Sequence, residues 1–251
     1  PRLPSFDRTW SAYAAGVGGM GVGTISKILV VAGHIQGYRV RFCDKKGLAI
    51  RNGGVYTHVI YSKTEDRISP LVPYGKADLL LGLDILEAVR GLDPKAGFRV
   101  ASRDQTAAIV NTAKTETVMS LIGKDGFEIA ALKKWLQTYT KADEYFGMDL
   151  FKIAEKRLSN KLYANIMLLG VAFQRGLIPL ELGAMQLALK QMVKPIDLEA
   201  NQRAFEIGRW LAIHPEAFVE APDQKSYSQT VQEKRHILAK RWRGKGLARE
   251  Y

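Results

Sequence analysis

Metal-binding and disulfide-forming residues are scarce in this sequence. Cysteine occurs once, as Cys43, among 251 residues, and histidine occurs four times. An iron–sulfur cluster, a structural zinc site or a disulfide framework needs several such side chains close together. We therefore expect no metal ion to be ligated by this chain alone. So little cysteine is also typical of a reducing compartment, which predicts a cytoplasmic location.

Long apolar runs are missing as well. The best candidate for a membrane span, residues 162–173, is shorter than the roughly 18 to 20 residues that a span requires, and it contains Asn165. No basic segment followed by an apolar one opens the sequence, so we expect neither a secretory signal nor a membrane span. Because 47% of the residues are hydrophobic, the chain can bury a sizeable core, and the composition predicts a globular protein.

Acidic residues are fewer than basic ones: the sequence has 25 Asp and Glu and 37 Lys and Arg, which give a net charge of +12. Such an excess suits a nucleic acid, an anionic ligand or an acidic protein partner, and composition does not choose among them. Much of it falls on residues 45–51 and on a predicted basic helix over 227–249. A nucleic-acid-binding protein would use residues 240–245. The basic residues of this helix are interspersed with an apolar stripe, however, which favours a partner subunit over nucleic acid.

The character of the chain changes near residue 148. Before it, β-type runs alternate with helical patterns, and we expect strands ending at residue 16 and over 38–43, 55–61, 79–83, 99–101 and 107–110, with helices over 24–36 and 85–90. After it the pattern is helical, over 150–174, 180–192 and 198–213. Residues 1–148 are therefore predicted to form an α/β, Rossmann-like domain with a mostly parallel sheet and helices on both faces. Residues 149–251 are predicted to form a helical region that packs on it.

A glycine-rich segment, GVGGMGVGT over residues 16–24, follows the first predicted strand and precedes a helix. It satisfies the G-x-G-x-x-G pattern through Gly16, Gly18 and Gly21. Such a turn lets backbone N–H groups at a helix N-terminus approach a phosphate, although the same glycines also suit close packing of a helix on a strand. An NAD-type dehydrogenase is one alternative, with Asp44 as the acid that binds the ribose. The additional glycines and a second, basic glycine-rich loop over 45–54 argue against it.

Several further segments carry a resemblance to a known family. They are KGLAIRNGGVYTHV at 46–59, ADLLLG at 77–82, NT at 111–112, ANIMLLG at 164–170, QRGLIPL at 174–180 and NQRAFEIGR at 201–209. Together with the glycine turn they resemble the gamma-type domain of 2-oxoacid:ferredoxin oxidoreductases, in particular those acting on indolepyruvate. The resemblance covers nearly the whole chain.

This resemblance implies a role in the CoA-dependent oxidative decarboxylation of a 2-oxo acid, such as an arylpyruvate, to an acyl-CoA with electrons passed to ferredoxin. Family members use thiamine diphosphate with Mg²⁺ and [4Fe-4S] clusters. One cysteine cannot hold a cluster, and the sequence has no Gly-Asp-Gly followed by Asn at the spacing of a thiamine diphosphate site. The resemblance therefore implies a beta subunit that carries no cofactor itself, is inactive alone and depends on a larger alpha subunit.

Candidate site residues follow from the two glycine-rich segments. The backbone amides of the first segment would hold phosphates of coenzyme A or line the thiamine cavity, or the segment would be a packed turn at the subunit interface. In the second, Arg51 is a candidate catalytic residue, and His58 in the next strand is another, although its position favours a structural, hydrogen-bonded histidine. Asn165 and Asn201 are predicted to be structural or interface residues. The predicted cofactor-binding residues are Gly16, Gly18, Gly19, Gly21, Thr24, Arg51, Asn52 and Gly53.

Overall fold

The computed structural model describes residues 1–46, 54–64, 67–93, 99–114 and 128–218. Residues 1–213 form one compact unit, and a second unit begins at His214. Within the described ranges, no helix is long and apolar enough to cross a membrane. The predicted basic helix over 227–249 lies outside the described residues. The division into domains at residue 148 stays a prediction.

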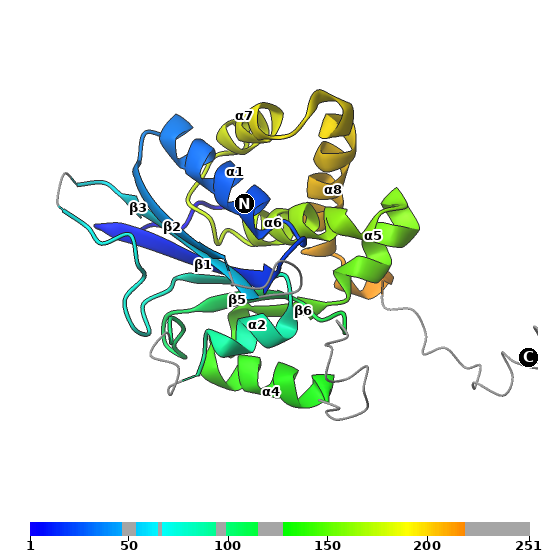
Figure 1. Ribbon diagram of the computed structural model, residues 1–251, viewed down its shortest axis with the longest axis horizontal. Helices are drawn as coiled ribbons and strands as arrows, with labels where there is room; N and C mark the ends of the chain where they lie inside the picture. Colours follow the sequence, from blue (N-terminus) through cyan, green and yellow to red (C-terminus); the bar gives the residue numbers. More distant parts are fainter. Residues whose placement is uncertain (47–53, 65–66, 94–98, 115–127, 219–251) are drawn as a thin grey trace, which may run out of the picture. The chain divides into compact units, whose positions relative to one another are not determined.

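A six-stranded sheet with the order β2-β3-β1-β4-β5-β6 forms the centre of the first unit (Figure 1). β4 pairs in parallel with β1 and β5, β5 pairs in parallel with β6, and β3 lies antiparallel between β1 and β2. Five strands therefore share one direction and β3 alone opposes them, so the expected α/β class is confirmed. The strands are β1 (Thr9–Val17), β2 (Arg39–Lys46), β3 (Gly54–Ser62), β4 (Leu79–Gly82), β5 (Ala107–Asn111) and β6 (Tyr145–Met148).

β1 occupies the middle of the sheet although its alanine-rich sequence has a weak propensity for strand. Ala12 pairs with Val59 of β3 on one side and with Leu79 of β4 on the other. The Trp10 ring also stacks on Tyr61 of β3, with 4.8 Å between ring centroids. Pairing on both sides and burial thus supply the stability that local propensity lacks.

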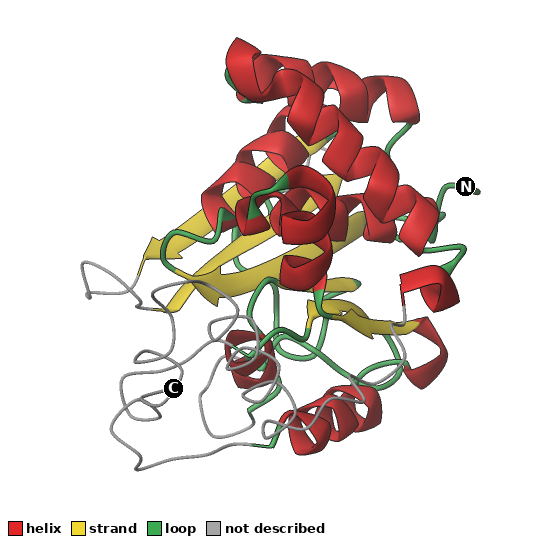
Figure 2. Ribbon diagram, turned by 90° about the vertical axis from the view of Figure 1, so that its right-hand side faces the viewer, coloured by secondary structure: helices red, strands yellow, loops and turns green. Residues whose placement is uncertain are grey.

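Helices cover both faces of the sheet (Figures 1 and 2). The hydroxyl of Tyr61 on β3 donates a hydrogen bond of 2.7 Å to the carbonyl of Leu29, which fastens α1 to its face. α2 and α4 cover the opposite face, where they contact each other. The helices on the α1 side are α1 (Val22–Ile35), α5 (Leu150–Leu158), α6 (Ala164–Gln174), α7 (Leu182–Met192) and α8 (Leu198–Leu211), and those opposite are α2 (Ile85–Arg90) and α4 (Ile129–Tyr139).

Two local expectations from the sequence are corrected, and two elements were not predicted. The single helix expected over 150–174 is divided, because Ser159 adopts a left-handed φ of 55° and the Asn160 side chain accepts the N–H of Leu162 to start a new turn. Residues 99–101 are not a strand, although backbone hydrogen bonds tie them to residues 75–77. The sequence also gave no indication of α4 and β6.

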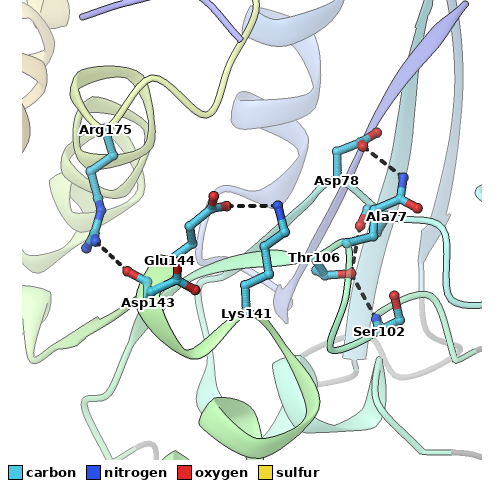
Figure 3. Close-up of polar contacts among 9 residues, drawn as sticks. Ala77, Asp78, Ser102, Thr106, Lys141, Asp143, Glu144 and Arg175 are labelled. Atoms are coloured by element: carbon cyan, nitrogen blue, oxygen red, sulfur yellow. Dashed lines mark hydrogen bonds and ion pairs between the residues drawn. The ribbon is translucent and has the colours of Figure 1, made fainter. Parts of the chain in front are cut away.

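Polar side chains connect the loops at the starts of β4 and β5 (Figure 3). The Thr106 hydroxyl donates to the Ala77 carbonyl at 2.6 Å and accepts the Ser102 N–H at 2.9 Å. At the edge strand β6, the Arg175 guanidinium after α6 donates to the Asp143 carbonyl at 3.3 Å. These contacts hold the register of the parallel half of the sheet and tie its edge to the helical layer.

Helices α6 and α8 approach each other very closely. A Cβ added to Gly170 would lie 2.2 Å from the Phe205 carbonyl oxygen, and one added to Gly208 would lie 2.0 Å from the Met167 carbonyl oxygen. Further along, the Arg209 Nε donates to the Gln174 side chain at 3.0 Å. Only glycine at these two positions permits the two backbones to come so close.

We expect Gly208→Ala to lower the free energy of unfolding by about 2 to 3 kcal/mol, because the added methyl group overlaps the backbone of α6. Gly183→Ala is the matched control. Gly183 also lies in a helix, but its added Cβ meets nothing within 4 Å, so this change should stabilise by up to about 1 kcal/mol. Urea denaturation measures both changes, and equal stabilities of the two variants would contradict the close approach.

Candidate functional site

The glycine turn connects β1 to α1 and presents backbone N–H groups. Gly19 and Gly21 have φ values of +96° and +89°, in the left-handed region that glycine adopts without strain. Gly21 is the N-cap of α1 and has no side chain to cap it, and the first turn of the helix has no acidic residue. The N–H groups of Val22 and Gly23 have no acceptor within the helix, so this end of α1 suits an anion.

A cavity of about 370 Å³ opens beside this turn. Its wall combines backbone of the turn, amide side chains, one lysine and a few apolar side chains. The lining residues are Gly19, Met20, Gly21, Thr24, Asn160, Leu162, Tyr163, Asn165, Met192, Val193, Lys194, Asp197 and Asn201.

Three helices begin at this cavity. α1 contributes its N-cap Gly21, α6 its N-cap Tyr163, and α8 its N-cap Asp197. Each helix N-terminus carries a partial positive charge, and Lys194 adds a full one. The Asp197 carboxylate offsets part of this charge and can accept hydrogen bonds from hydroxyl or amino groups. The arrangement therefore suits a ligand that has both an anionic group and hydrogen-bond donors.

Asn165 joins the glycine turn to α6. A Cβ added to Gly21 would lie 2.1 Å from the Asn165 Nδ2, so the turn rests directly on this amide. Asn201 is held by α8 itself, since its Nδ2 donates to the Asp197 carbonyl at 2.7 Å. Both asparagines, predicted to be structural or interface residues, thus lie in the cavity wall. Sequence reasoning missed Asn160 and Lys194, and no motif marks either of them.

The predicted glycine-turn residues fall into two groups. Gly19, Gly21 and Thr24 line the cavity. Gly16 has a packing role, because a Cβ there would lie 2.9 Å from the Leu83 Cβ. Gly18 is half-buried in the turn and is not among the lining residues. The predicted site residues Arg51, Asn52 and Gly53 lie outside the described residues.

His58 is buried in β3 away from the cavity. Its Nδ1 accepts the Val72 N–H at 3.2 Å, and its ring meets the Tyr13 ring edge-on at 5.1 Å between centroids. Burial lowers the pKa of His58 to about 4, so the imidazole is neutral near pH 7. These contacts favour the structural interpretation of His58 over the catalytic one.

Asp44 is not placed as the ribose-binding acid of a dinucleotide site. Antiparallel β3 separates β2 from β1, and Asp44 is not among the residues that line the cavity. Its Oδ1 instead accepts hydrogen bonds from the hydroxyls of Ser26 in α1, at 2.9 Å, and Thr57 in β3. The alternative of an NAD-type dehydrogenase therefore loses the acidic residue on which it depended. Among the described residues, no group of three or more His, Cys, Asp or Glu side chains could hold a metal ion.

The fold and the glycine turn define an α/β domain of the kind found in 2-oxoacid oxidoreductases, and comparisons with known proteins identify its family. Residues 11–210 match the family described as pyruvate ferredoxin/flavodoxin oxidoreductase. The chain belongs to this family, and the resemblance seen in the sequence is confirmed.

Two similar proteins are archaeal and bear the same name, indolepyruvate oxidoreductase subunit IorB. The protein of Thermococcus kodakarensis is 26% identical over 203 residues, which cover 80% of this chain and 95% of that protein. The protein of Pyrococcus horikoshii is 26% identical over 206 residues, with coverage of 80% and 95%. The match thus extends over nearly the whole of both relatives.

Solved structures share the fold. The pyruvate oxidoreductase subunit PORC of Thermotoga maritima has a TM-score of 0.55 and 19% identity, covering 81% of this chain and 97% of that chain. The 2-oxoglutarate:ferredoxin oxidoreductase of Magnetococcus marinus, solved with 2-oxoglutarate, coenzyme A and succinyl-CoA bound, has a TM-score of 0.59 and 16% identity, covering 87% and 33%. The same fold therefore occurs as a separate subunit and as a third of a longer chain.

The depressed pKa of His58 predicts a pH dependence of stability. The unfolded chain binds a proton at this histidine near pH 6.5, whereas the folded chain binds it only near pH 4. The free energy of unfolding should therefore fall as the pH is lowered from about 6.5 to about 4, and this contribution should be fully present above pH 6.5. His58→Asn keeps an acceptor for the Val72 N–H but does not titrate. Urea denaturation across this range should show a shallower slope for the variant, and parallel slopes would refute the assignment.

Proposed function

We propose that this chain is the small, cofactor-free subunit of an arylpyruvate:ferredoxin oxidoreductase, of the indolepyruvate type. The observation that carries the proposal is the family match over residues 11–210, together with relatives of similar extent named as indolepyruvate oxidoreductase subunits. The complex would convert a 2-oxo acid and coenzyme A to an acyl-CoA and carbon dioxide, and pass the electrons to ferredoxin. The scarcity of cysteine supports a cytoplasmic location for it.

The proposed partner is a larger alpha subunit that carries thiamine diphosphate with Mg²⁺ and the [4Fe-4S] clusters. A [4Fe-4S] cluster needs about four thiolates, and this chain has only Cys43. The chain would therefore contribute binding and positioning groups to a reaction whose electron carriers lie in the partner.

The cavity at the glycine turn is the proposed contact with coenzyme A. Its N–H groups, three helix N-termini and Lys194 fit a phosphate, and the absence of a side chain at Gly19, where an added Cβ meets nothing within 4 Å, leaves the backbone open to it. Thr24 and the wall asparagines can donate to the same anion, while Asp197 can accept from a hydroxyl or amino group of the nucleotide. Coenzyme A, when bound, supplies the thiol that accepts the acyl group.

Co-expression with a candidate alpha subunit tests the proposed function. A complex purified through a tag on one subunit should contain both chains and reduce a viologen dye only when indolepyruvate and coenzyme A are both present. The chain purified alone should show no such activity, because it lacks the electron carriers. Activity of the isolated chain, or failure to form a stable complex, would contradict the proposal.

Lys194→Gln tests the assignment of the cavity to coenzyme A. Losing one charge-assisted contact of about 1.5 kcal/mol should raise the KM of the complex for coenzyme A about tenfold and leave the KM for the 2-oxo acid unchanged. Lys190→Gln is the matched control, because Lys190 is equally exposed four residues earlier and does not line the cavity. A change in the KM for the 2-oxo acid alone would place the cavity beside the thiamine site instead.

A further inference from the structure

A second cavity is lined by residues of α2, of α4 and of the segment after α2. These two helices cover the face of the sheet opposite to α1 (Figure 1). Its volume is about 470 Å³, within the range of small-molecule sites. We call it the arginine–aromatic pocket. Aromatic and aliphatic side chains make up most of its wall, and two arginines and one aspartate interrupt it. The lining residues are Val89, Arg90, Leu92, Asp93, Arg99, Trp135 and Tyr139.

The guanidinium group of Arg99 is held in place at this pocket. Its Cζ lies 5.6 Å from the centroid of the Tyr74 ring and 5.9 Å from that of the Tyr139 ring, and its Nε donates to the Ala101 carbonyl at 3.1 Å. The backbone is held too, because the Arg99 carbonyl accepts the Gly75 N–H at 3.0 Å. A cation oriented in this way loses little side-chain entropy when it binds an anion.

The two terminal nitrogens of Arg99 are left unused by the described part of the fold. Within the part of the chain that the structure describes, they make no hydrogen bond and no ion pair, and Asp93 in the same wall is not joined to Arg99. Arg90 differs, because its guanidinium is paired with the Glu87 carboxylate. Among the described residues, the guanidinium edge of Arg99 is therefore oriented but has no acceptor.

Large aromatic side chains around this edge are left uncovered. Trp135 is 55% exposed, Tyr139 46% and Tyr74 59%. Trp135 and Tyr139 lie one turn apart on α4, so their rings present a continuous apolar wall to the pocket. Aromatic walls of this kind bind flat apolar groups, and a guanidinium edge binds a carboxylate through two parallel hydrogen bonds.

We propose that the arginine–aromatic pocket binds a small organic anion that joins one carboxylate to a flat apolar group. The carboxylate pairs with the terminal nitrogens of Arg99, and the apolar group lies against Trp135 and Tyr139. This site is separate from the cavity at the glycine turn, and it does not depend on the proposed function of the chain.

The probe that tests this proposal is 3-phenylpropionate, with its uncharged amide as the chemical control. Isothermal titration calorimetry on the full chain should show saturable binding of the acid and at least tenfold weaker binding of the amide, because only the acid pairs with Arg99. Equal affinities for acid and amide, or no binding of the acid at millimolar concentration, would overturn the proposal without any variant.

Two matched variants locate the site. Arg99→Gln should weaken binding of the acid at least tenfold, whereas Arg103→Gln, at an exposed arginine that does not line the pocket, should leave it unchanged. Lys194→Gln, in the other cavity, should also leave it unchanged, and loss of binding in that variant would overturn the assignment.

If Arg99→Gln fails to fold, Trp135→Phe tests the location of the site instead. Loss of the ligand-induced change in tryptophan fluorescence then supports the pocket, and its persistence refutes it.

Discussion

Two glycines, Gly170 and Gly208, permit the contact on which the rest of the site depends. Without side chains at these positions, α6 and α8 pack with their backbones almost touching. Residues at the N-termini of both helices line the same cavity as the glycine turn. Asn165 and Asn201, near the starts of the two helices, then lie in one wall. A wider separation of the helices would move these amides apart and open the cavity.

The antiparallel strand β3 gives the glycine turn different neighbouring residues from those in a dinucleotide-binding fold. Because β3 is inserted between β1 and β2, Asp44 of β2 does not line the cavity and is bound by hydroxyls of α1 and β3. The turn still presents backbone N–H groups to the cavity. The other side chains that would contact the proposed anion come from α6, α8 and the segments before these two helices, in the helical half of the chain.

The two faces of the sheet offer different chemistry. On the α1 side, helix N-termini, amides and a lysine surround a polar cavity that is open to backbone approach. On the α2 side, the Arg99 guanidinium lies among exposed aromatic rings. The two proposed sites therefore place their cations in different surroundings, Lys194 beside amides and helix N-termini and Arg99 among aromatic rings.

The sequence by itself determined the elements whose signals are local. The apolar period of α1, the buried run of β4 and the glycines of the turn all lie within a few residues of the structure they specify. Family motifs marked α6 and α8 but not their mutual arrangement. Only the tertiary structure decided the insertion of β3, the break at Ser159 and the meeting of Gly21, Asn165 and Lys194. Those features depend on contacts between residues distant in the chain, which no local pattern encodes.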